Sequence, residues 1–522
     1  MRSHCAQGPS WPQLWPHDPY VKRIQITIDN RLRMRASDLD AETLTYLQRE
    51  FTHRNPQKAK LEKQAEGAKY NRAKPFLKFA LAKSAAAQPA TIPTWALNGD
   101  ELSFPRGGRE RLTFLLEDRD YLVDTIDRRT DGTLPRPNAR YTGELWDFQQ
   151  RMVETGMQVE EGIARSPTGS GKTEAIIGLM CEANLPSLVI VSEQGLLDQW
   201  IRRVRQSTNI TDIGIIGDGK FNPRPITVGM QQTLKRRIAD VRGYFGFVAC
   251  DEAHLFAADT FLEVVDQLPA RYRVGFTADE HRKDGKEFLL YDTLGPVFAE
   301  VKEKKLVDEG YILDVEVRLV PTGFEREWWT ELHPQARGME MLRLINEMAE
   351  DTERNAIATQ IALWAAREGH QVLVMAHHTV HCRRLLADIA ASNPRVGLLI
   401  GEDKDAYVRG IAGMMQGSVQ IGVGTYKKMG TGIDLKALSR GVAVTPVHLN
   451  KFFLKQLKGR FCRTATDKAD SAIYVLYDEL IFGLAPVENF KRWASRVLVR
   501  DDDQWIDAKE YLKREKGEKA ES

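Results

Sequence analysis

The stretch Ser166-Pro-Thr-Gly-Ser-Gly-Lys-Thr173 decides the fold class of this chain. It follows a short apolar segment, Gly162–Arg165, that we expect to be a strand, and it opens a segment, Glu174–Ala183, that we expect to be a helix. Glycines in such a turn let successive backbone N–H groups point at phosphate oxygens, and the positive end of the helix adds to the attraction. Lys172 would contact the β- and γ-phosphates of ATP, and the Thr173 hydroxyl would bind Mg²⁺. The predicted phosphate-binding residues are Thr168, Gly169, Ser170, Gly171, Lys172 and Thr173.

A second motif with two carboxylates follows a predicted buried strand, Phe247–Cys250, and reads Asp251-Glu-Ala-His254. A carboxylate at the carboxyl end of a strand near the phosphate loop can hold Mg²⁺. The adjacent Glu252 can orient and deprotonate an attacking water. The separation from Lys172 is 251 − 172 = 79 residues, which leaves room for a few strand–helix units in one sheet. We therefore predict Thr173 and Asp251 as metal ligands, and Lys172, Asp251 and Glu252 as catalytic residues.

Short apolar segments alternate with amphipathic helices on both sides of these motifs. The first series of predicted strands is Gly162–Arg165, Ser187–Val191, Ile226–Gly229, Phe247–Cys250 and Arg273–Phe276. The second series is Gln371–Met375, Gly397–Ile400, Val419–Val423, Gly441–Val444 and Ala472–Leu476. This alternation is typical of parallel sheets that are covered by helices on both faces. The sequence therefore predicts an α/β protein with two parallel-sheet domains in tandem, at about 141–310 and 311–490.

The two ends of the chain have a different texture. Residues 1–20 contain four prolines and two tryptophans without periodicity, and we expect a flexible lead-in. Hairpins are predicted at 24–34 and at 95–104, with helices between and after them, so 21–140 should form a small α+β domain. The last stretch, Lys509–Ser522, is a mixed charge run. We expect it to be a solvated, fraying helix within a charged tail over 491–522.

Composition excludes several classes of protein. Apolar residues at 42% and charged residues at 28% are ordinary globular values, which excludes disordered and collagen-like chains. The longest apolar runs, Ser187–Val191 and Val372–Ala376, are far shorter than the roughly 20 residues that cross a bilayer. The five cysteines are scattered and fit neither a zinc cluster nor a disulfide framework. His377, His378 and His381 lack a matching cysteine or carboxylate pattern. We expect no zinc, no membrane partner, no secretory signal, and a place in the cytoplasm of a bacterial or phage-infected cell.

The charge distribution is more informative than the net charge of +2. Residues 1–140 hold 24 Lys+Arg and 17 Asp+Glu, a net of +7, whereas residues 141–522 hold 74 − 24 = 50 and 72 − 17 = 55, a net of −5. Within 49–83 there are 10 basic and 3 acidic residues, with Phe51, Tyr70, Phe76 and Phe79 interleaved. Basic residues mixed with aromatic ones are typical of a nucleic-acid-binding surface, although a solvated amphipathic helix is the alternative.

Further motifs follow one another in order from about 145 to 465. They are Leu145-Trp-Asp-Phe-Gln149, Val191-Ser-Glu-Gln-Gly-Leu-Leu-Asp-Gln-Trp200, Ile226-Thr-Val-Gly-Met-Gln-Gln-Thr-Leu234, Gly275-Phe-Thr-Ala-Asp279, Arg282-Lys-Asp284, Val372–His378, Gly424-Thr425, Gly430-Thr-Gly-Ile-Asp434 and Gln456-Leu-Lys-Gly-Arg-Phe-Cys-Arg463. Together with the two motifs above, this set resembles the superfamily 2 helicases and translocases with a DEAH motif. Within them it resembles the restriction-subunit-like branch, in particular the phage UvsW-type and XPB-like DNA helicases. The resemblance implies two RecA-like domains, with ATP hydrolysed in the cleft between them.

The resemblance also implies roles for residues around the nucleotide. Gln149 would read the adenine, and Gly432 and Asp434 would sense the nucleotide from the second domain. Arg460 and Arg463 would act as arginine fingers, and Gln456 belongs to the same catalytic motif. Taken alone, the two arginines would be better explained as surface ion pairs.

Other implied roles concern the nucleic acid. His254 and Thr277 would couple the ATP site to the strand, although a core histidine is the alternative for His254. The predicted strand contacts are Gln199, Gln232, Thr425, Lys427 and Lys428. Two positions depart from the family pattern: Asp279 replaces the second Thr of a Thr-Ala-Thr motif, and Met230 stands where Thr is common. Neither departure touches the ATP chemistry.

We therefore expect an ATP-dependent DNA helicase or translocase that remodels duplex or branched DNA, as in DNA repair and recombination. Its cofactors would be ATP and Mg²⁺. An RNA helicase is the first alternative, because it has the same motor. The second is the motor subunit of a nuclease or restriction assembly that supplies a separate nuclease, since the chain shows no nuclease constellation of its own.

Overall fold

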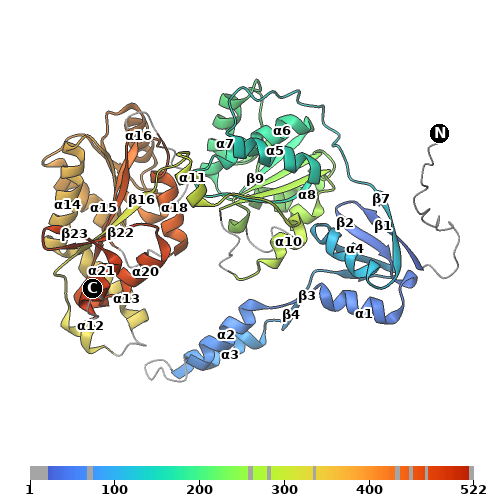
Figure 1. Cartoon of the computed structure of the whole chain (residues 1–522), viewed down its shortest axis with the longest axis horizontal. Helices are drawn as coiled ribbons and strands as arrows, with labels where there is room; N and C mark the ends of the chain where they lie inside the picture. The colour runs from blue at the N-terminus through green and yellow to red at the C-terminus, as the bar shows by residue number, and fades with distance from the viewer. Residues whose placement is uncertain are drawn as a thin grey trace, which may run out of the picture.

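The computed structural model describes residues 22–67, 75–256, 263–278, 284–332, 337–429, 435–445, 451–464 and 468–516. Two eight-stranded sheets and one five-stranded sheet organise these residues. Figure 1 shows the five-stranded sheet at the N-terminal end, one large sheet in the middle and the second at the C-terminal end. We call the middle unit lobe 1 and the C-terminal one lobe 2. None of the helices in the described ranges is long and apolar enough to cross a membrane.

Lobe 1 is built on a mainly parallel sheet in the order β11-β10-β12-β9-β13-β14-β8-β15. Its strands are β8 (Glu161–Arg165), β9 (Ser187–Val191), β10 (Gly214–Gly217), β11 (Lys220–Asn222), β12 (Ile226–Met230), β13 (Phe247–Asp251), β14 (Tyr272–Thr277) and β15 (Val297–Glu300). Its helices are α5 (Asp147–Val159), α6 (Lys172–Ala183), α7 (Gln194–Ser207), α8 (Gln231–Val241) and α10 (Phe288–Leu294). Every residue of β9, β13 and β14 is buried, as expected for central strands covered on both faces.

Lobe 2 repeats this architecture in the order β18-β19-β17-β20-β21-β16-β22-β23. Its strands are β16 (Val315–Pro321), β17 (Gln371–Ala376), β18 (Val396–Leu399), β19 (Ile421–Thr425), β20 (Leu438–Ala443), β21 (Ser471–Tyr477), β22 (Val497–Asp501) and β23 (Gln504–Asp507). Its helices are α12 (Glu327–Glu331), α13 (Arg337–Glu350), α14 (Thr352–Arg367), α15 (Thr379–Ala390), α16 (Lys404–Gln416), α17 (Tyr426–Met429), α18 (Lys451–Phe461), α19 (Glu479–Phe482), α20 (Ala485–Trp493) and α21 (Ala508–Glu515). Helix α11 (Glu303–Asp308) lies in the connection between the lobes (Figure 1). The predicted α/β class with two tandem parallel-sheet domains is confirmed.

The predicted charged tail over 491–522 is wrong for the part that the structure describes. Strand β22 pairs in parallel with β16, and β23 pairs with β22, so this segment completes the sheet of lobe 2. Helix α21 buries Ala508, Tyr511 and Leu512. Three apolar residues at helical spacing were enough to dock a helix whose other positions are charged. Residues 517–522 and the predicted lead-in at 1–20 lie outside the described residues.

The N-terminal unit contains the predicted hairpins in a sheet of order β5-β6-β2-β1-β7. Its elements are β1 (Lys22–Ile28), β2 (Arg31–Arg35), α1 (Ala41–Glu50), β5 (Ala96–Asn98), β6 (Glu101–Pro105), α4 (Arg109–Glu117) and β7 (Tyr121–Asp127). The alternating residues Ile24, Ile26 and Ile28 face its core. A parallel pairing of β1 with β7 closes the sheet across about a hundred residues of chain.

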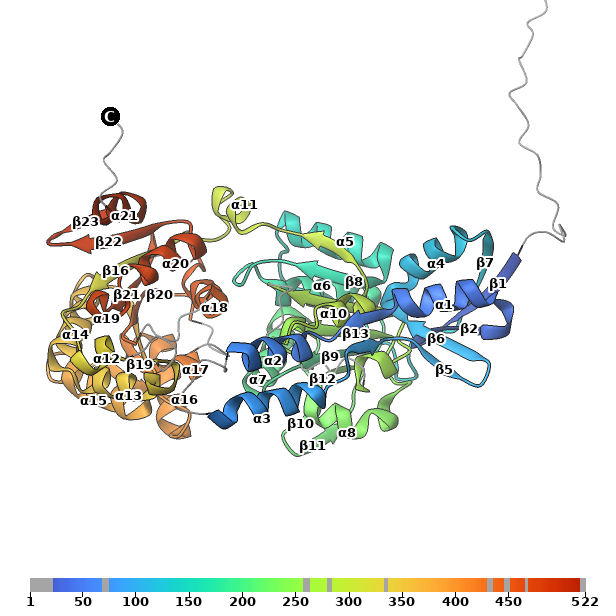
Figure 2. The ribbon, with the colours of Figure 1, turned by 90° about the horizontal axis from the view of Figure 1, so that it is seen from below.

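A helical hairpin interrupts the N-terminal unit, and we call it the arm. It consists of α2 (Pro56–Gly67) and α3 (Pro75–Ala86) and rises from a two-stranded sheet of β3 (Thr52–Arg54) and β4 (Thr91–Pro93). In Figures 1 and 2 the arm projects away from the five-stranded sheet and points toward lobe 2. Of its described side chains only Ala65 and Ala85 are buried, so the arm has almost no core of its own.

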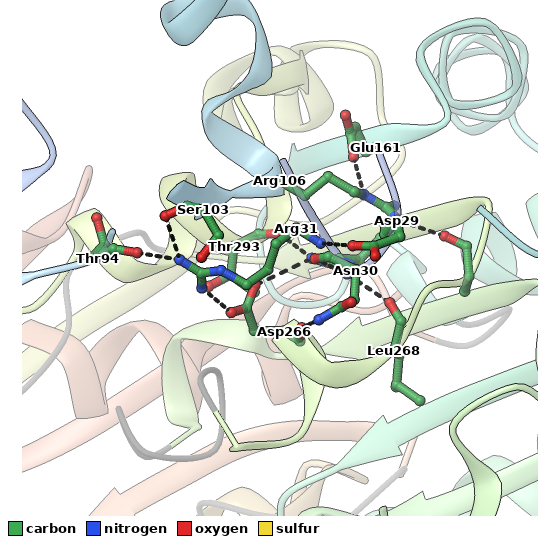
Figure 3. Close-up of polar contacts among 12 residues, drawn as sticks. Asp29, Asn30, Arg31, Thr94, Ser103, Arg106, Glu161, Asp266, Leu268 and Thr293 are labelled. Carbon is green, nitrogen blue, oxygen red and sulfur yellow. Dashed lines mark hydrogen bonds and ion pairs between the residues drawn. The ribbon is translucent and has the colours of Figure 1, made fainter. Parts of the chain in front are cut away.

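Buried charged side chains join the N-terminal unit to lobe 1 (Figure 3). Arg106 is fully buried, and its Nε donates to Glu161 Oε2 at 2.6 Å. Arg31 forms an ion pair with Asp266, and Asn30 Nδ2 donates to the Asp266 carbonyl at 2.9 Å. Ion pairs removed from water are stable only when their geometry is fixed. These contacts anchor the N-terminal unit on lobe 1.

Candidate nucleotide-binding site

The phosphate loop connects the end of β8 to the start of α6. Gly169 and Gly171 have φ values of 89° and 73°, in the left-handed region that favours glycine. The hydroxyl groups of Ser166 and Ser170 lie 2.5 Å apart, and Ser170 Oγ donates to the Pro167 carbonyl at 2.7 Å. These contacts hold the loop in its curled shape, with Lys172 at the first position of the helix.

Gln149 is fixed against this loop at both ends of its amide. Its Nε2 donates to the Ser170 carbonyl at 2.9 Å, and its Oε1 accepts from the Trp146 backbone N–H at 2.9 Å. The side chain is buried. The structure thus places Gln149, predicted to bind the nucleotide, directly beside the phosphate loop.

The two carboxylates of the second motif lie at the end of β13, beside Lys172. Glu252 has φ 48° and ψ 50°, an uncommon backbone conformation for a residue other than glycine. Its Oε1 lies 3.2 Å from Lys172 Nζ. Burial favours a higher pKa for Glu252, but Lys172 and His254 outweigh this, so the pKa is lowered and the carboxylate is ionised.

The pKa of Asp251 is shifted in the opposite direction from that of Glu252. Burial and the charge of Glu252 raise the pKa of Asp251. Trp200 Nε1 donates to Asp251 Oδ2 at 2.8 Å and fixes the orientation of the carboxylate. The adjacent carboxyl groups are therefore driven apart in acidity by their surroundings.

Thr173, Asp251 and Glu252 line one cavity, and the Thr173 hydroxyl and the Asp251 carboxylate are ligand types that fit Mg²⁺. Hard carboxylate and hydroxyl oxygens suit this ion, which takes its other ligands from phosphates and water. Glu252 Oε2 is buried and accepts no hydrogen bond, so it can still accept one from a water molecule. Among the described residues, no three His, Cys, Asp or Glu side chains are grouped as metal ligands. His381 instead contacts Asn355 Oδ1 at 2.7 Å, and burial lowers its pKa to about 3.

Lobe 2 contributes two arginines to the same cavity, which has a volume of about 460 Å³. Arg460 lies in the last turn of α18, and Arg463 follows the helix. Burial lowers the pKa of Arg460 to about 10, against the opposing effects of Tyr407 and Glu252. Burial, together with the neighbouring Arg203, lowers the pKa of Arg463 to about 10. The structure therefore brings both predicted arginine fingers to the cavity that Lys172 and the carboxylates line.

The phosphate loop also touches α18 directly. Cys462 Sγ lies 3.5 Å from the Thr168 carbonyl. A Cβ added at Gly459 would overlap the side chain of Thr168, so this position requires glycine for the lobes to approach. The Lys458–Glu303 ion pair, at 2.9 Å, adds a contact beside them. The cleft between the lobes is closed at the loop.

A chain of contacts runs from the cavity to the end of β14. His254 Nδ1 lies 3.6 Å from Glu252 Oε2 and 2.7 Å from Thr277 Oγ1. His254 and Thr277 are buried. The pair predicted to couple the two sites is therefore in direct contact.

The predicted nucleic-acid contacts fall in different places. Gln199 of α7 lines the nucleotide cavity, and its predicted contact with the strand stays a prediction. Gln232 is exposed at the start of α8, and Lys427 is exposed in α17. Thr425 ends β19, and Lys428 Nζ lies 4.3 Å from the ring centre of Tyr407. These four remain predictions.

The remaining predicted positions lie outside the described residues or at the end of a strand. Gly432, Asp434 and Asp279 lie outside the described residues, as does the side chain of Gln456. Met230 ends β12 and is half-buried.

The sequence did not reveal several residues that line the cavity. The Glu174 carboxylate accepts from Tyr141 OH at 2.8 Å and pairs with Arg203 Nε at 3.0 Å. The rings of Tyr311 and Trp146 lie 5.1 Å apart at the edge of the cavity. Glu174 directly follows the phosphate loop, and Arg203 lies one helical turn beyond Gln199. The sequence therefore placed both beside predicted site residues and could have indicated them. Tyr141 and Tyr311 lie outside helices and strands, and no signal in the sequence indicated them.

The fold is that of two RecA-like lobes, and the phosphate loop and the Asp-Glu-Ala-His motif line one cavity with residues of the second lobe. Residues 142–280 match the family model described as "Type III restriction enzyme, res subunit". The chain is 32% identical over 191 residues to "Putative DNA 3'-5' helicase Rad25" of Haloarcula marismortui, which covers 35% of this chain and 30% of the relative. It is 25% identical over 348 residues to "Putative ATP-dependent RNA helicase L396" of Acanthamoeba polyphaga mimivirus, 65% of each chain.

Among solved structures, the fold is similar to a fragment of a putative HsdR subunit of a type I restriction enzyme from Vibrio vulnificus YJ016. The TM-score is 0.52 at 16% identity, over 70% of this chain and 71% of that one. The matches span between 30% and 65% of the length of the two relatives above. The resemblance of the core to superfamily 2 helicases of the restriction-subunit-like branch, with XPB/Rad25 helicases among its relatives, is confirmed.

Proposed function

We propose that this chain is an ATP-dependent DNA helicase or translocase. One observation carries the proposal: a single cavity receives Lys172 and Glu252 from lobe 1 and Arg460 and Arg463 from lobe 2. Transfer of the γ-phosphoryl group to water requires neutralised phosphate charge and a positioned water. Because each lobe supplies only part of this machinery, hydrolysis requires the closed cleft.

The residues of lobe 1 have separate tasks in this proposal. Thr173 and Asp251 would hold Mg²⁺, which when bound neutralises charge on the β- and γ-phosphates. Lys172 would bind the same phosphates. Glu252, ionised and held beside Lys172, would orient the attacking water and accept its proton. Gln149 would position the phosphate loop and contact the adenine.

Opening and closing of the cleft would drive movement along the strand. The contact between His254 and Thr277 supports this coupling, because it connects Glu252 to the end of β14. A change at the phosphates would be transmitted to the segment after β14 and then to the nucleic acid.

DNA is the proposed track, and branched or duplex DNA in repair and recombination is the proposed context. The name of the Haloarcula relative and the net charge of +7 in residues 1–140 support DNA with a basic accessory unit. The name of the mimivirus relative supports an RNA helicase as the second candidate. The match to a restriction subunit supports a motor within a nuclease assembly as the third.

ATPase activity across a panel of nucleic acids tests the proposal. Single-stranded DNA, duplex, Holliday-type junctions and RNA would each be added to the protein with ATP and Mg²⁺. We expect stimulation by DNA, strongest with branched DNA, and weaker or no stimulation by RNA. Stimulation by RNA alone would favour the second candidate, and no stimulation by any of them would overturn the motor. Lys172→Ala and Glu252→Gln should abolish turnover and keep the circular dichroism spectrum.

A further inference from the structure

Two phenylalanines of the arm are more exposed than any other large apolar side chain of α1 to α4 that the structure describes. Phe76 is 82% exposed and Phe79 is 70% exposed. With Lys83 they lie at spacings of three and four along α3, so the three residues share one face. Bulky aromatic residues grouped on an exposed face indicate a binding surface.

These phenylalanines do not serve the packing of the arm. Helices α2 and α3 pack on each other, and their buried positions in the described part are alanines, Ala65 and Ala85. Small residues at the contact let the helices approach closely while the larger rings point outward. The exposed rings therefore do not contribute to the contact between α2 and α3, and Lys78 Nζ lies 5.9 Å from the centre of the Phe79 ring on the same helix.

Charge identifies the kind of partner that would cover the rings. The described residues of the arm include five lysines and two glutamates, and α3 has no acidic residue. The lysines are Lys58, Lys60, Lys63, Lys78 and Lys83, and the glutamates are Glu62 and Glu66. Aromatic rings flanked by lysines suit unpaired nucleobases joined by phosphates, because rings stack on bases and ammonium groups attract phosphates. A purely apolar protein groove would not require the lysines.

The root of the arm, which comprises β3, β4 and the adjacent Thr94, contacts α10 of lobe 1, and we call this contact the clamp. Asp292 accepts from Thr94 Oγ1 at 2.8 Å and contacts His53 Nε2 at 2.9 Å. The His53 ring stacks on Phe288 with 4.0 Å between ring centres. Helix α10 follows β14, the strand that ends at Thr277. The root of the arm therefore contacts the segment of lobe 1 that comes after Thr277 in the sequence.

The junction at Arg106 and Asp266 (Figure 3) secures the rest of the N-terminal unit to the same lobe. The arm is therefore attached to lobe 1 by two separate sets of contacts. It should move with lobe 1 when the cleft opens and closes.

We propose that the α3 face of Phe76 and Phe79 binds unpaired nucleobases where the two strands of a duplex part. Lys78 and Lys83 would attract the flanking phosphates, and the clamp on Asp292 would hold the arm in place while the lobes move. In Figures 1 and 2 the arm points from the N-terminal unit toward lobe 2. The inference rests on the proposed function, since it gives the DNA motor its strand-separating element.

The test compares the full-length double variant Phe76→Ala/Phe79→Ala with the wild type and with Phe114→Ala. Phe114 is the matched control, because it is 65% exposed on α4 of the same unit but lies outside the arm. A DNA fork carries 2-aminopurine at its first unpaired position, so stacking of a protein ring on this base quenches its fluorescence. Fork unwinding and ATP hydrolysis are measured in the same samples.

We expect quenching by the wild type and by Phe114→Ala, and its loss in the double variant. Fork affinity should fall about tenfold or more, and base pairs opened per ATP hydrolysed should fall by a similar factor. Phe76→Trp/Phe79→Trp should restore both. Equal quenching and equal unwinding per ATP in all variants would overturn the inference while the motor stands. If no DNA stimulates the wild-type ATPase, the proposed function itself is wrong. This result is seen with the wild type alone, so it can be told apart from a failure of the inference about the arm.

Discussion

His254 Nδ1 lies 2.7 Å from Thr277 Oγ1, and this contact joins the Asp-Glu-Ala-His motif to the end of β14. A buried hydrogen bond of this kind contributes about 1–3 kcal/mol when a partner would otherwise be left unpaired. Together with the 3.6 Å approach of His254 Nδ1 to Glu252 Oε2, it connects Glu252 to the segment that leads to α10. Weakening it should loosen the coupling between the two sites.

Thr277→Val removes the hydroxyl group and keeps the side-chain shape. We expect the ratio of DNA-stimulated to basal ATPase to fall by about five- to tenfold, consistent with losing roughly 1 kcal/mol of coupling. Steady-state ATPase with and without DNA measures this ratio. Thr359→Val is the control, because Thr359 Oγ1 is buried and makes no hydrogen bond in the structure. An unchanged ratio in Thr277→Val would show that the signal takes another route.

Because Gly459 packs against Thr168, a larger residue at position 459 should impair closure of the cleft. In Gly459→Ala the new Cβ would overlap the Thr168 side chain, so α18 cannot approach the phosphate loop as it does here. Because the arginines reside on and just after α18, we expect kcat to fall at least tenfold while the melting temperature changes little. Gly323→Ala is the matched control, since a Cβ there meets no atom within 4 Å. Thr168→Gly in the same chain should restore part of the activity; full activity of Gly459→Ala alone would refute the closure argument.

We expect the Asp251 carboxylate to lower the stability of the folded protein at neutral pH although ATP hydrolysis requires it. Its raised pKa means that the folded state penalises the ionised form. That penalty is absent below the ordinary aspartate pKa of about 4 and is complete once the pH exceeds the raised value. Asp251→Asn should therefore raise the melting temperature at pH 7 in EDTA and abolish ATPase activity, and the gain should shrink toward pH 4. Thermal unfolding at both pH values measures it; a melting temperature lowered at pH 7 would contradict the electrostatic argument.

The main features of the site could be predicted because they are local in sequence. The phosphate loop and the Asp-Glu-Ala-His motif are short segments at strand ends, so their spacing alone indicates their chemistry. That Gln199 lines the cavity could not be predicted, because the face of α7 that turns toward the cavity depends on how the helix packs against the sheet. Tyr141 and Tyr311 reach the cavity from segments without periodicity. The C-terminal strand β22 was missed because its partner, β16, lies about 180 residues earlier, and non-local pairing leaves little trace in composition.

Arg460 gives the sharpest test of the two-lobe site. It reaches the cavity from α18, opposite Glu252, and partial removal from water lowers its pKa only to about 10, so it stays charged at neutral pH. An arginine finger contributes about 10³-fold or more to phosphoryl transfer. Arg460→Ala should therefore lower kcat by about that factor, with ATP binding, measured by a fluorescent analogue, reduced much less. Arg460→Lys should not restore the rate, because an ammonium cannot reproduce the planar fork of the guanidinium. Arg409→Ala, at an exposed arginine of α16, should behave as wild type. Normal hydrolysis by Arg460→Ala would show that lobe 2 does not complete the site.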